Sequence, residues 1–189
     1  MKCVLQTLLL CSVLLFSKAH GSVFIGYEFG EMAFNDFKHF AGEIGYSLKD
    51  NKAVRVSVLN IALSEEHLSS NSARSVDGDN VFGLWRGLEL FYDQPIRKNL
   101  SWSITGGYFD TEYQHTQLTE SVTHKTASIG VALSYGEPSL FGINNLYWRF
   151  TLPLRYYFKP LDRTMLGDAV INRSTYEYNP WIYIGYRFN

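Results

Sequence analysis

Apolar and polar residues alternate along most of this chain, and the alternation has a period of two. Residues 54–58, for example, read Val-Arg-Val-Ser-Val. Because successive side chains of a β-strand point to opposite faces, this period indicates strands whose two faces meet different surroundings. Eight segments show it, at residues 22–30, 40–48, 54–58, 83–92, 100–108, 127–135, 146–158 and 181–188. The sequence therefore predicts an all-β protein of eight strands.

The connections between these segments differ in length, with long ones tending to alternate with short ones. Residues 49–52 and 93–99 are short, 31–39 is moderate, 136–145 is longer than a tight turn needs, and 64–80, 110–123 and 159–175 are long. A meander of this kind places its long loops at one end and its short turns at the other, as transmembrane barrels do. We therefore expect an eight-stranded antiparallel up-and-down transmembrane β-barrel.

The composition of the two strand faces bears on which face points outward. One face is almost purely aliphatic and aromatic, and its Tyr, Trp and Phe residues lie towards the strand ends, as the aromatic girdles of membrane barrels do. The other face carries Gly, Ser, Thr, Glu and Arg. The pattern alone also permits a soluble sandwich or barrel that buries its apolar face. The girdles and the charged opposite face favour lipid on the outside.

A charged inner face makes ion pairing close to obligatory, because an unpaired buried charge costs several kcal/mol. We expect a lumenal network of acidic and basic side chains, comprising Glu28, Glu43, Glu89, Arg55, Arg149, Arg155 and Arg187. Eight strands leave an interior that side chains just fill, so no open pore is expected. Arg86 falls on the outward register, so we expect either a position near the membrane interface or a local bulge.

The N-terminus predicts export. Lys2 precedes an apolar run over residues 4–16, and small residues then favour cleavage after residue 19 or 21. We therefore assign residues 1–21 to a signal peptide and residues 22–189 to the barrel domain. Both cysteines, Cys3 and Cys11, lie within the signal. The whole chain has a formal charge of -1 and no basic run, which argues against nucleic-acid binding.

The last strand carries the most specific local feature. Residues 181–188 read Trp-Ile-Tyr-Ile-Gly-Tyr-Arg-Phe, with Asn189 following. With this ending, the chain resembles the small outer-membrane barrels of Gram-negative bacteria typified by the OmpA membrane domain and OmpX. The resemblance implies an outer-membrane location among lipid and lipopolysaccharide. It also implies that Tyr186 and Phe188 form a signal for the barrel-assembly machinery, although that signal usually ends on the aromatic residue itself.

Three functions remain open. A lipid A hydrolase or acyltransferase needs a serine–histidine pair, for which His124, Ser128 and His39 are the candidates, but the sequence supplies no orienting group. A narrow channel would use the lumenal charges, yet bulky aromatic residues argue for a plug. We favour a structural or surface-interaction barrel, not an enzyme, whose long loops contact a ligand that the sequence leaves unidentified. No metal or cofactor is expected, because the histidines lack ligand-like spacing.

Overall fold

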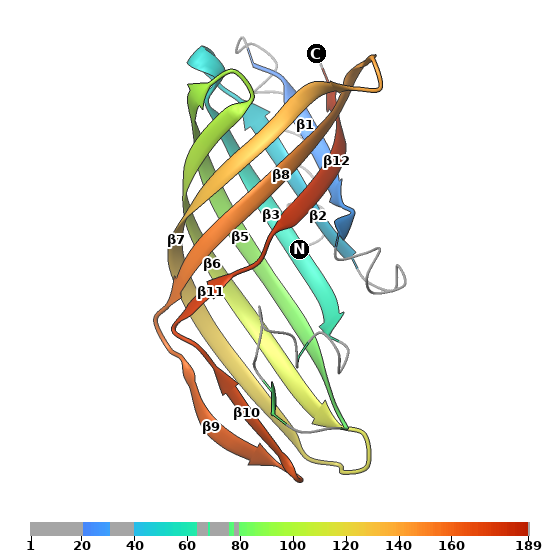
Figure 1. Ribbon diagram of the computed structural model, residues 1–189, viewed down its shortest axis with the longest axis vertical. Helices are drawn as coiled ribbons and strands as arrows, with labels where there is room; N and C mark the ends of the chain where they lie inside the picture. The colour runs from blue at the N-terminus through green and yellow to red at the C-terminus, as the bar shows by residue number, and fades with distance from the viewer. Residues whose placement is uncertain (1–20, 31–39, 64–67, 69–75, 78–79, 189) are drawn as a thin grey trace, which may run out of the picture.

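The computed structural model describes residues 21–30, 40–63, 68, 76–77 and 80–188. Within these residues, eight antiparallel strands close into a barrel, because β7 pairs with β8, β8 with β12, and β12 with β1 (Figure 1). In chain order the wall strands are β1 (Val23–Glu28), β2 (Phe40–Ser47), β3 (Ala53–Leu63), β5 (Val81–Arg97), β6 (Leu100–His115), β7 (Ser121–Leu140), β8 (Ile143–Tyr157) and β12 (Trp181–Phe188). The predicted signal peptide lies outside the described residues, except for Gly21.

Five further elements complete the fold of the described residues. A short 3-10 helix, η1 (Lys49–Asn51), connects β2 to β3. The strand β11 (Tyr176–Tyr178) pairs with β8 and extends the wall ahead of β12. A second, three-stranded sheet consists of β4 (Val76–Asp77), β9 (Leu161–Leu166) and β10 (Ala169–Arg173) in the described part of the chain. Figure 1 shows β9 and β10 at the end of the barrel where β6 and β7 reach furthest.

Several predicted boundaries were wrong, because strands continue where loops were expected. The predicted loop 136–145 is a two-residue hairpin turn, Phe141–Gly142, in which both residues have positive φ, of 54° and 75°. Such turns match the twist of the strands they join. The predicted loop 110–123 shrinks to 116–120, and the predicted loop 159–175 contains β9 and β10. Outward side chains turn polar beyond the lipid belt while backbone pairing continues, so alternation in hydropathy underestimates strand length.

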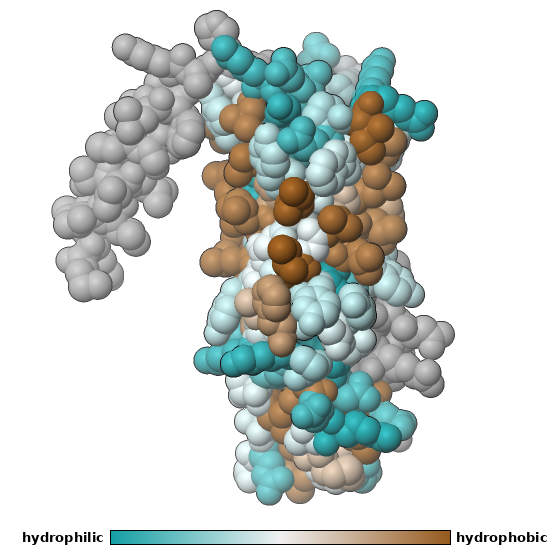
Figure 2. All heavy atoms as spheres, turned by 90° about the vertical axis from the view of Figure 1, so that its left-hand side faces the viewer, coloured by the Kyte–Doolittle hydropathy of each residue, from teal (hydrophilic) through white to brown (hydrophobic). Residues whose placement is uncertain are grey.

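The outward face of the wall forms an apolar belt. Ile25, Leu88, Ile104 and Val131 each keep about half of their surface exposed, although all are strongly hydrophobic. On the face of the molecule seen in Figure 2, hydrophobic side chains form a brown band between two hydrophilic zones. Burying a continuous apolar surface of this kind requires lipid or another apolar partner. The described residues contain no helix that is long and apolar enough to span a membrane.

Aromatic side chains border the belt on both sides, as the sequence predicted. Towards the short turns lie Tyr46, Tyr92, Trp102, Tyr135, Trp148 and Tyr186, and towards the long loops lie Tyr27, Phe40, Tyr108, Tyr156 and Phe158. On β8, Trp148 and Tyr156 are eight residues apart, which is about 27 Å along a strand. A tilt of about 40° reduces this to about 20 Å along the membrane normal, close to the apolar height of membrane barrels.

Arg86 lies where the belt gives way to charge. Its neighbours across the sheet are Asn60 on β3 and Asp110 on β6, and Asp110 is in turn opposite Lys125 on β7. The paired register continues through Arg86 without a bulge, and its half-exposed side chain lies 4.0 Å from the Glu112 carboxylate. This polar row marks the border of the belt. The strands β5, β6 and β7 extend past it, away from the short turns.

Candidate functional site: a charged lumen sealed at one end

The half of the lumen nearer the short turns contains a compact charge cluster. Arg55 on β3 lies 3.0 Å from the Glu43 carboxylate on β2 and 2.9 Å from the Asp93 carboxylate on β5. Arg149 on β8 approaches the same two carboxylates, at 3.3 Å and 3.7 Å. We call Glu43, Arg55, Asp93 and Arg149 the short-turn cluster. Two guanidinium groups face two carboxylates, so the formal charges of this cluster cancel.

Polar and aromatic neighbours complete the short-turn cluster. The Tyr147 hydroxyl donates a hydrogen bond to Glu43 at 2.8 Å, and the Ser103 hydroxyl donates one to Asp93 at 2.5 Å. The Arg55 guanidinium also lies over the Phe91 ring, 3.7 Å from its centroid. Charge-assisted hydrogen bonds and cation–π contacts of this kind offset the cost of removing charges from water. The cluster thereby joins β2, β3, β5, β6 and β8 across the barrel interior.

A second cluster occupies the half of the lumen nearer the long loops. Arg155 on β8 makes two hydrogen bonds to Glu89 on β5, of 2.9 Å and 2.7 Å. Arg155 also lies 3.6 Å from Glu177 on β11, and Glu177 is 2.7 Å from Arg173 on β10. We call Glu89, Arg155, Arg173 and Glu177 the long-loop cluster. It too combines two guanidinium groups with two carboxylates.

Arg173 connects the second sheet to the barrel wall. Its guanidinium donates hydrogen bonds to the Thr111 hydroxyl at 2.6 Å and the Tyr157 hydroxyl at 3.2 Å, in addition to its pairing with Glu177. Burial opposes the charged form, but Glu177, Tyr157 and Tyr113 together favour it and raise the pKa of Arg173 above its usual range. One side chain from β10 thus binds groups on β6, β8 and β11.

The long-loop end of the lumen is filled by an apolar cluster. Val76 on β4, Leu166 on β9 and Ile171 on β10 are almost completely buried. They belong to one hydrophobic cluster with Trp85 and Phe109 of the barrel wall, whose rings stack with centroids 5.5 Å apart. The second sheet therefore packs into the mouth of the barrel, and side chains of the described residues block the lumen at this level.

Two residues of the predicted lumenal network lie apart from both clusters. The Glu28 carboxylate accepts backbone N–H groups of Gly30 and Ile182, at 3.0 Å and 2.9 Å. Arg187, near the end of β12, forms no ion pair with any residue that the structure describes, and its Nε is buried without a hydrogen-bond partner there.

Sequence reasoning missed three members of the clusters, namely Asp93, Arg173 and Glu177. Asp93 was assigned to a turn, although its position continues the inward register of Glu89 and Phe91. Arg173 comes from the predicted loop 159–175, and Glu177 lies between that loop and the predicted last strand, in residues that were assigned to neither. The alternation of inward and outward residues along β5 could have identified Asp93. No periodic signal reveals that β10 packs against the mouth of the barrel.

Of the serine and histidine candidates, the structure describes His124 and Ser128, and their side chains lie apart along β7. His124 and Ser128 both point inward from β7, but four residues along a strand separate their Cα atoms by about 13 Å. The His124 Nε2 lies 2.8 Å from the Lys159 carbonyl oxygen, whereas Ser128 Oγ has no hydrogen-bond partner among the described residues. His39 lies outside the described residues. No cluster of three or more potential metal ligands occurs in the described part of the chain.

The residues proposed as an assembly signal lie on the outer surface of the last strand. Tyr186 and Phe188 point outward from β12, with ring centroids 5.1 Å apart. β12 pairs with β1 on one side and β8 on the other, so it closes the barrel. An exposed apolar wall, two aromatic girdles and a charged interior are what a lipid bilayer requires of a closed sheet. The chain has the architecture of a small outer-membrane β-barrel.

Comparisons with known proteins found solved structures of low similarity. No family model matches the sequence, and no curated protein matches it significantly. The chain is similar to the N-terminal β-barrel domain of Pseudomonas aeruginosa OprF, with 14% identity over 90% of this chain and 98% of that chain and a TM-score of 0.44. It is also similar to a major outer membrane protein from Thermus thermophilus, with 13% identity over 89% and 98% of the two chains and a TM-score of 0.39. Ail, the attachment invasion locus protein of Yersinia pestis, shows 16% identity over 89% and 97% of the two chains and a TM-score of 0.38. Because these TM-scores are low, the fold is established by the strand pairing and burial pattern of the chain itself.

Proposed function

We propose that this protein is an outer-membrane barrel that exposes its long-loop end at the cell surface and interacts there with external molecules or neighbouring lipopolysaccharide. The main support for the proposal is the set of strands that lies beyond the lipid belt, at the long-loop end of the barrel. The strands β5, β6 and β7 continue past the polar row at Arg86, and the second sheet packs against this extension. Arg173 and the apolar cluster hold the second sheet in place, so it presents a preorganised surface.

Side chains fill the lumen, which favours a role at the surface over the conduction of ions. Two cancelling charge clusters and the apolar cluster occupy successive levels of the interior. Eight-stranded barrels have room for side chains but little else. We therefore expect no defined conductance steps when the purified barrel is inserted into a planar bilayer. The separation of His124 from Ser128 likewise supports a function other than lipid A hydrolysis or acyl transfer.

The orientation can be tested by cysteine labelling, because both native cysteines lie in the predicted signal peptide. Asp162 on β9 and Phe141 in the β7–β8 turn are exposed at opposite ends of the barrel. In intact cells, a membrane-impermeant maleimide should label Asp162→Cys but label Phe141→Cys only after the outer membrane is permeabilised. The reverse pattern would place the short turns at the cell surface and overturn the proposal.

The surface role can be tested with paired surface variants. One combines Asp162→Ala, Arg163→Ala and Met165→Ala on the exposed side of β9, and the matched control combines Lys49→Ala, Glu137→Ala and Phe141→Ala at the short-turn end. The measurements are sedimentation of expressing cells by self-aggregation and retention of purified lipopolysaccharide by the solubilised barrel. We expect the β9 variant to lose at least one of these activities several-fold while the control keeps both. Wild-type protein with neither activity would leave a purely structural role.

A further inference from the structure

The short-turn end of the barrel contains a pocket, in contrast to the filled long-loop end. It has a volume of about 600 Å³ and opens between the β5–β6 turn, the β7–β8 hairpin and the end of β12. Ser134 and Arg149 line its inner part, and Trp148 of the aromatic girdle lines its edge. The short-turn cluster lies beneath it, because Arg149 belongs to both. A molecule that enters from this end therefore reaches a closed, polar floor.

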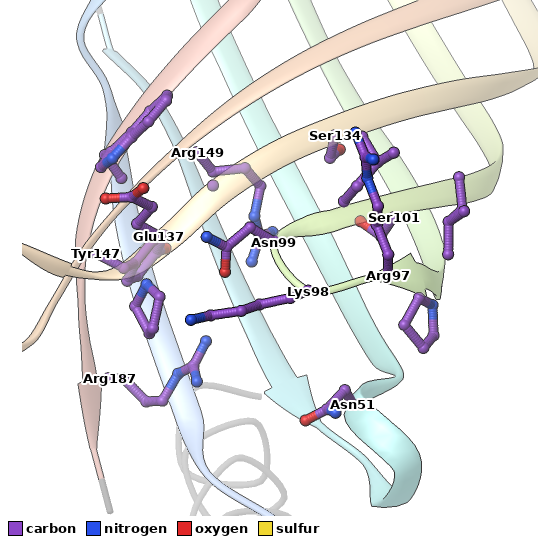
Figure 3. Close-up of a pocket in the computed structure, with 16 residues that line it drawn as sticks. Asn51, Arg97, Lys98, Asn99, Ser101, Ser134, Glu137, Tyr147, Arg149 and Arg187 are labelled. Atoms are coloured by element: carbon purple, nitrogen blue, oxygen red, sulfur yellow. The ribbon is translucent and has the colours of Figure 1, made fainter.

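The charges around this pocket do not cancel. Its cationic lining residues are Arg97, Lys98, Arg149 and Arg187, and its acidic lining residue is Glu137. Arg149 already has carboxylate partners in Glu43 and Asp93, whereas Arg187 has no ion pair within the described residues. Figure 3 shows the Lys98 and Arg187 side chains extending into the pocket from different elements. An excess of positive charge therefore remains at the pocket after the internal pairs are formed.

The Nε atom of Arg187 supplies a second, independent indication of a binding site. Its Nε atom is buried and makes no hydrogen bond to a described residue. A buried N–H group without a partner costs about 1–3 kcal/mol, so such groups are normally satisfied by protein, water or ligand. A guanidinium group with free donors beside a lysine is the arrangement that proteins use for phosphate and carboxylate groups. The size of the pocket suits a phosphorylated headgroup better than a bare ion.

We propose that the short-turn pocket binds a phosphate-bearing anion through Arg187, Lys98 and Arg149. The phosphate can belong to an anionic lipid headgroup that enters past Trp148, or to a soluble phosphorylated compound that enters along the barrel axis. Both sources offer the same chemistry to the three cationic side chains. The site is distinct from the proposed surface role, because it lies at the opposite end of the barrel.

The test is a calorimetric titration of the folded chain in a zwitterionic detergent. Short-chain phosphatidylglycerol represents the lipid source, glycerol 3-phosphate the soluble source, and short-chain phosphatidylcholine the lipid without net charge. We expect phosphatidylglycerol, glycerol 3-phosphate or both to bind more tightly than phosphatidylcholine. Lipid-only binding identifies a headgroup site, soluble-only binding identifies an aqueous ligand, and binding of both shows that the phosphate group itself is recognised.

Substitutions of the cationic lining residues test whether the anions bind at this pocket. Arg187→Gln and Lys98→Gln should each weaken the binding by about tenfold, whereas Arg86→Gln, which removes an exposed arginine at the other end, should leave it unchanged. Lys98 lies in an exposed turn, so Lys98→Gln keeps the test valid even if Arg187→Gln impairs assembly. Equal binding by wild type, Lys98→Gln and a folded Arg187→Gln protein, or no binding of either anion, would overturn the inference.

Discussion

The two lumenal clusters have the same charge inventory but are built from different parts of the fold. The four charged groups of the short-turn cluster all belong to wall strands that span the lipid belt. The long-loop cluster takes Glu89 and Arg155 from wall strands and Glu177 from β11, which extends the wall, but it takes Arg173 from β10 of the second sheet. The first cluster therefore links wall strands to one another, and the second links the extramembrane sheet to the wall.

The comparison shows that buried ion pairs can either link wall strands to one another or attach an additional sheet to the wall. In the short-turn cluster, each arginine contacts both carboxylates, so removing one side chain disturbs the whole group. In the long-loop cluster, the contacts form a chain from Glu89 through Arg155 and Glu177 to Arg173. This series of contacts can lose Arg173 at its end while Glu89, Arg155 and Glu177 stay paired. The two clusters should therefore respond differently to the loss of an arginine.

The largest expected effect is that of Arg55→Ala. This change leaves the buried Glu43 and Asp93 with Arg149 alone, and breaking a buried pair in this way costs about 3–5 kcal/mol. The free energy of unfolding, measured by equilibrium urea titration in lipid vesicles, should fall by that amount. Adding Asp93→Asn should restore part of it, because Glu43 and Arg149 then balance. A loss below about 1 kcal/mol would mean that the cluster contributes little to barrel stability.

Arg173→Ala should have an intermediate and local effect. Glu177 keeps Arg155 at 3.6 Å, so we expect a loss of about 1–3 kcal/mol, the range for leaving a buried polar group without one partner. The loss should appear as faster proteolysis within β9 and β10, while the heat-dependent electrophoretic shift of the barrel persists. Unchanged proteolysis would show that the apolar packing of Leu166, Ala169 and Ile171 holds the second sheet without the arginine.

The smallest expected effect is that of Arg86→Gln. The Arg86 side chain is half exposed, and its nearest carboxylate oxygen lies 4.0 Å away on Glu112. Exposed pairs of this kind contribute about 0.2–1 kcal/mol or nothing measurable. The urea midpoint in vesicles should therefore stay close to that of the wild type. A loss comparable to that of Arg55→Ala would show that the polar row at the belt border contributes more than exposed pairs normally do.

Much of the barrel was predictable from local patterns because lipid and lumen impose opposite requirements on neighbouring residues. The eight strands, the outward apolar face and the girdles follow from the alternation in hydropathy. The clusters were predictable only in part. Glu43, Glu89, Arg55, Arg149 and Arg155 lie on periodic segments, whereas the pairing of one residue with another depends on strand register across the barrel.

The sequence by itself determined the secondary structure class, the number of wall strands and which face of each wall strand is apolar, because each depends on the identity of residues two positions apart. Tertiary structure alone decided that β10 returns to the barrel mouth, that Arg173 joins the long-loop cluster and that Arg187 remains apart from both clusters. These outcomes depend on contacts between residues far apart in the chain. Arg173 and Thr111, for example, are 62 positions apart, yet a hydrogen bond of 2.6 Å joins their side chains, and no periodic pattern encodes such a contact.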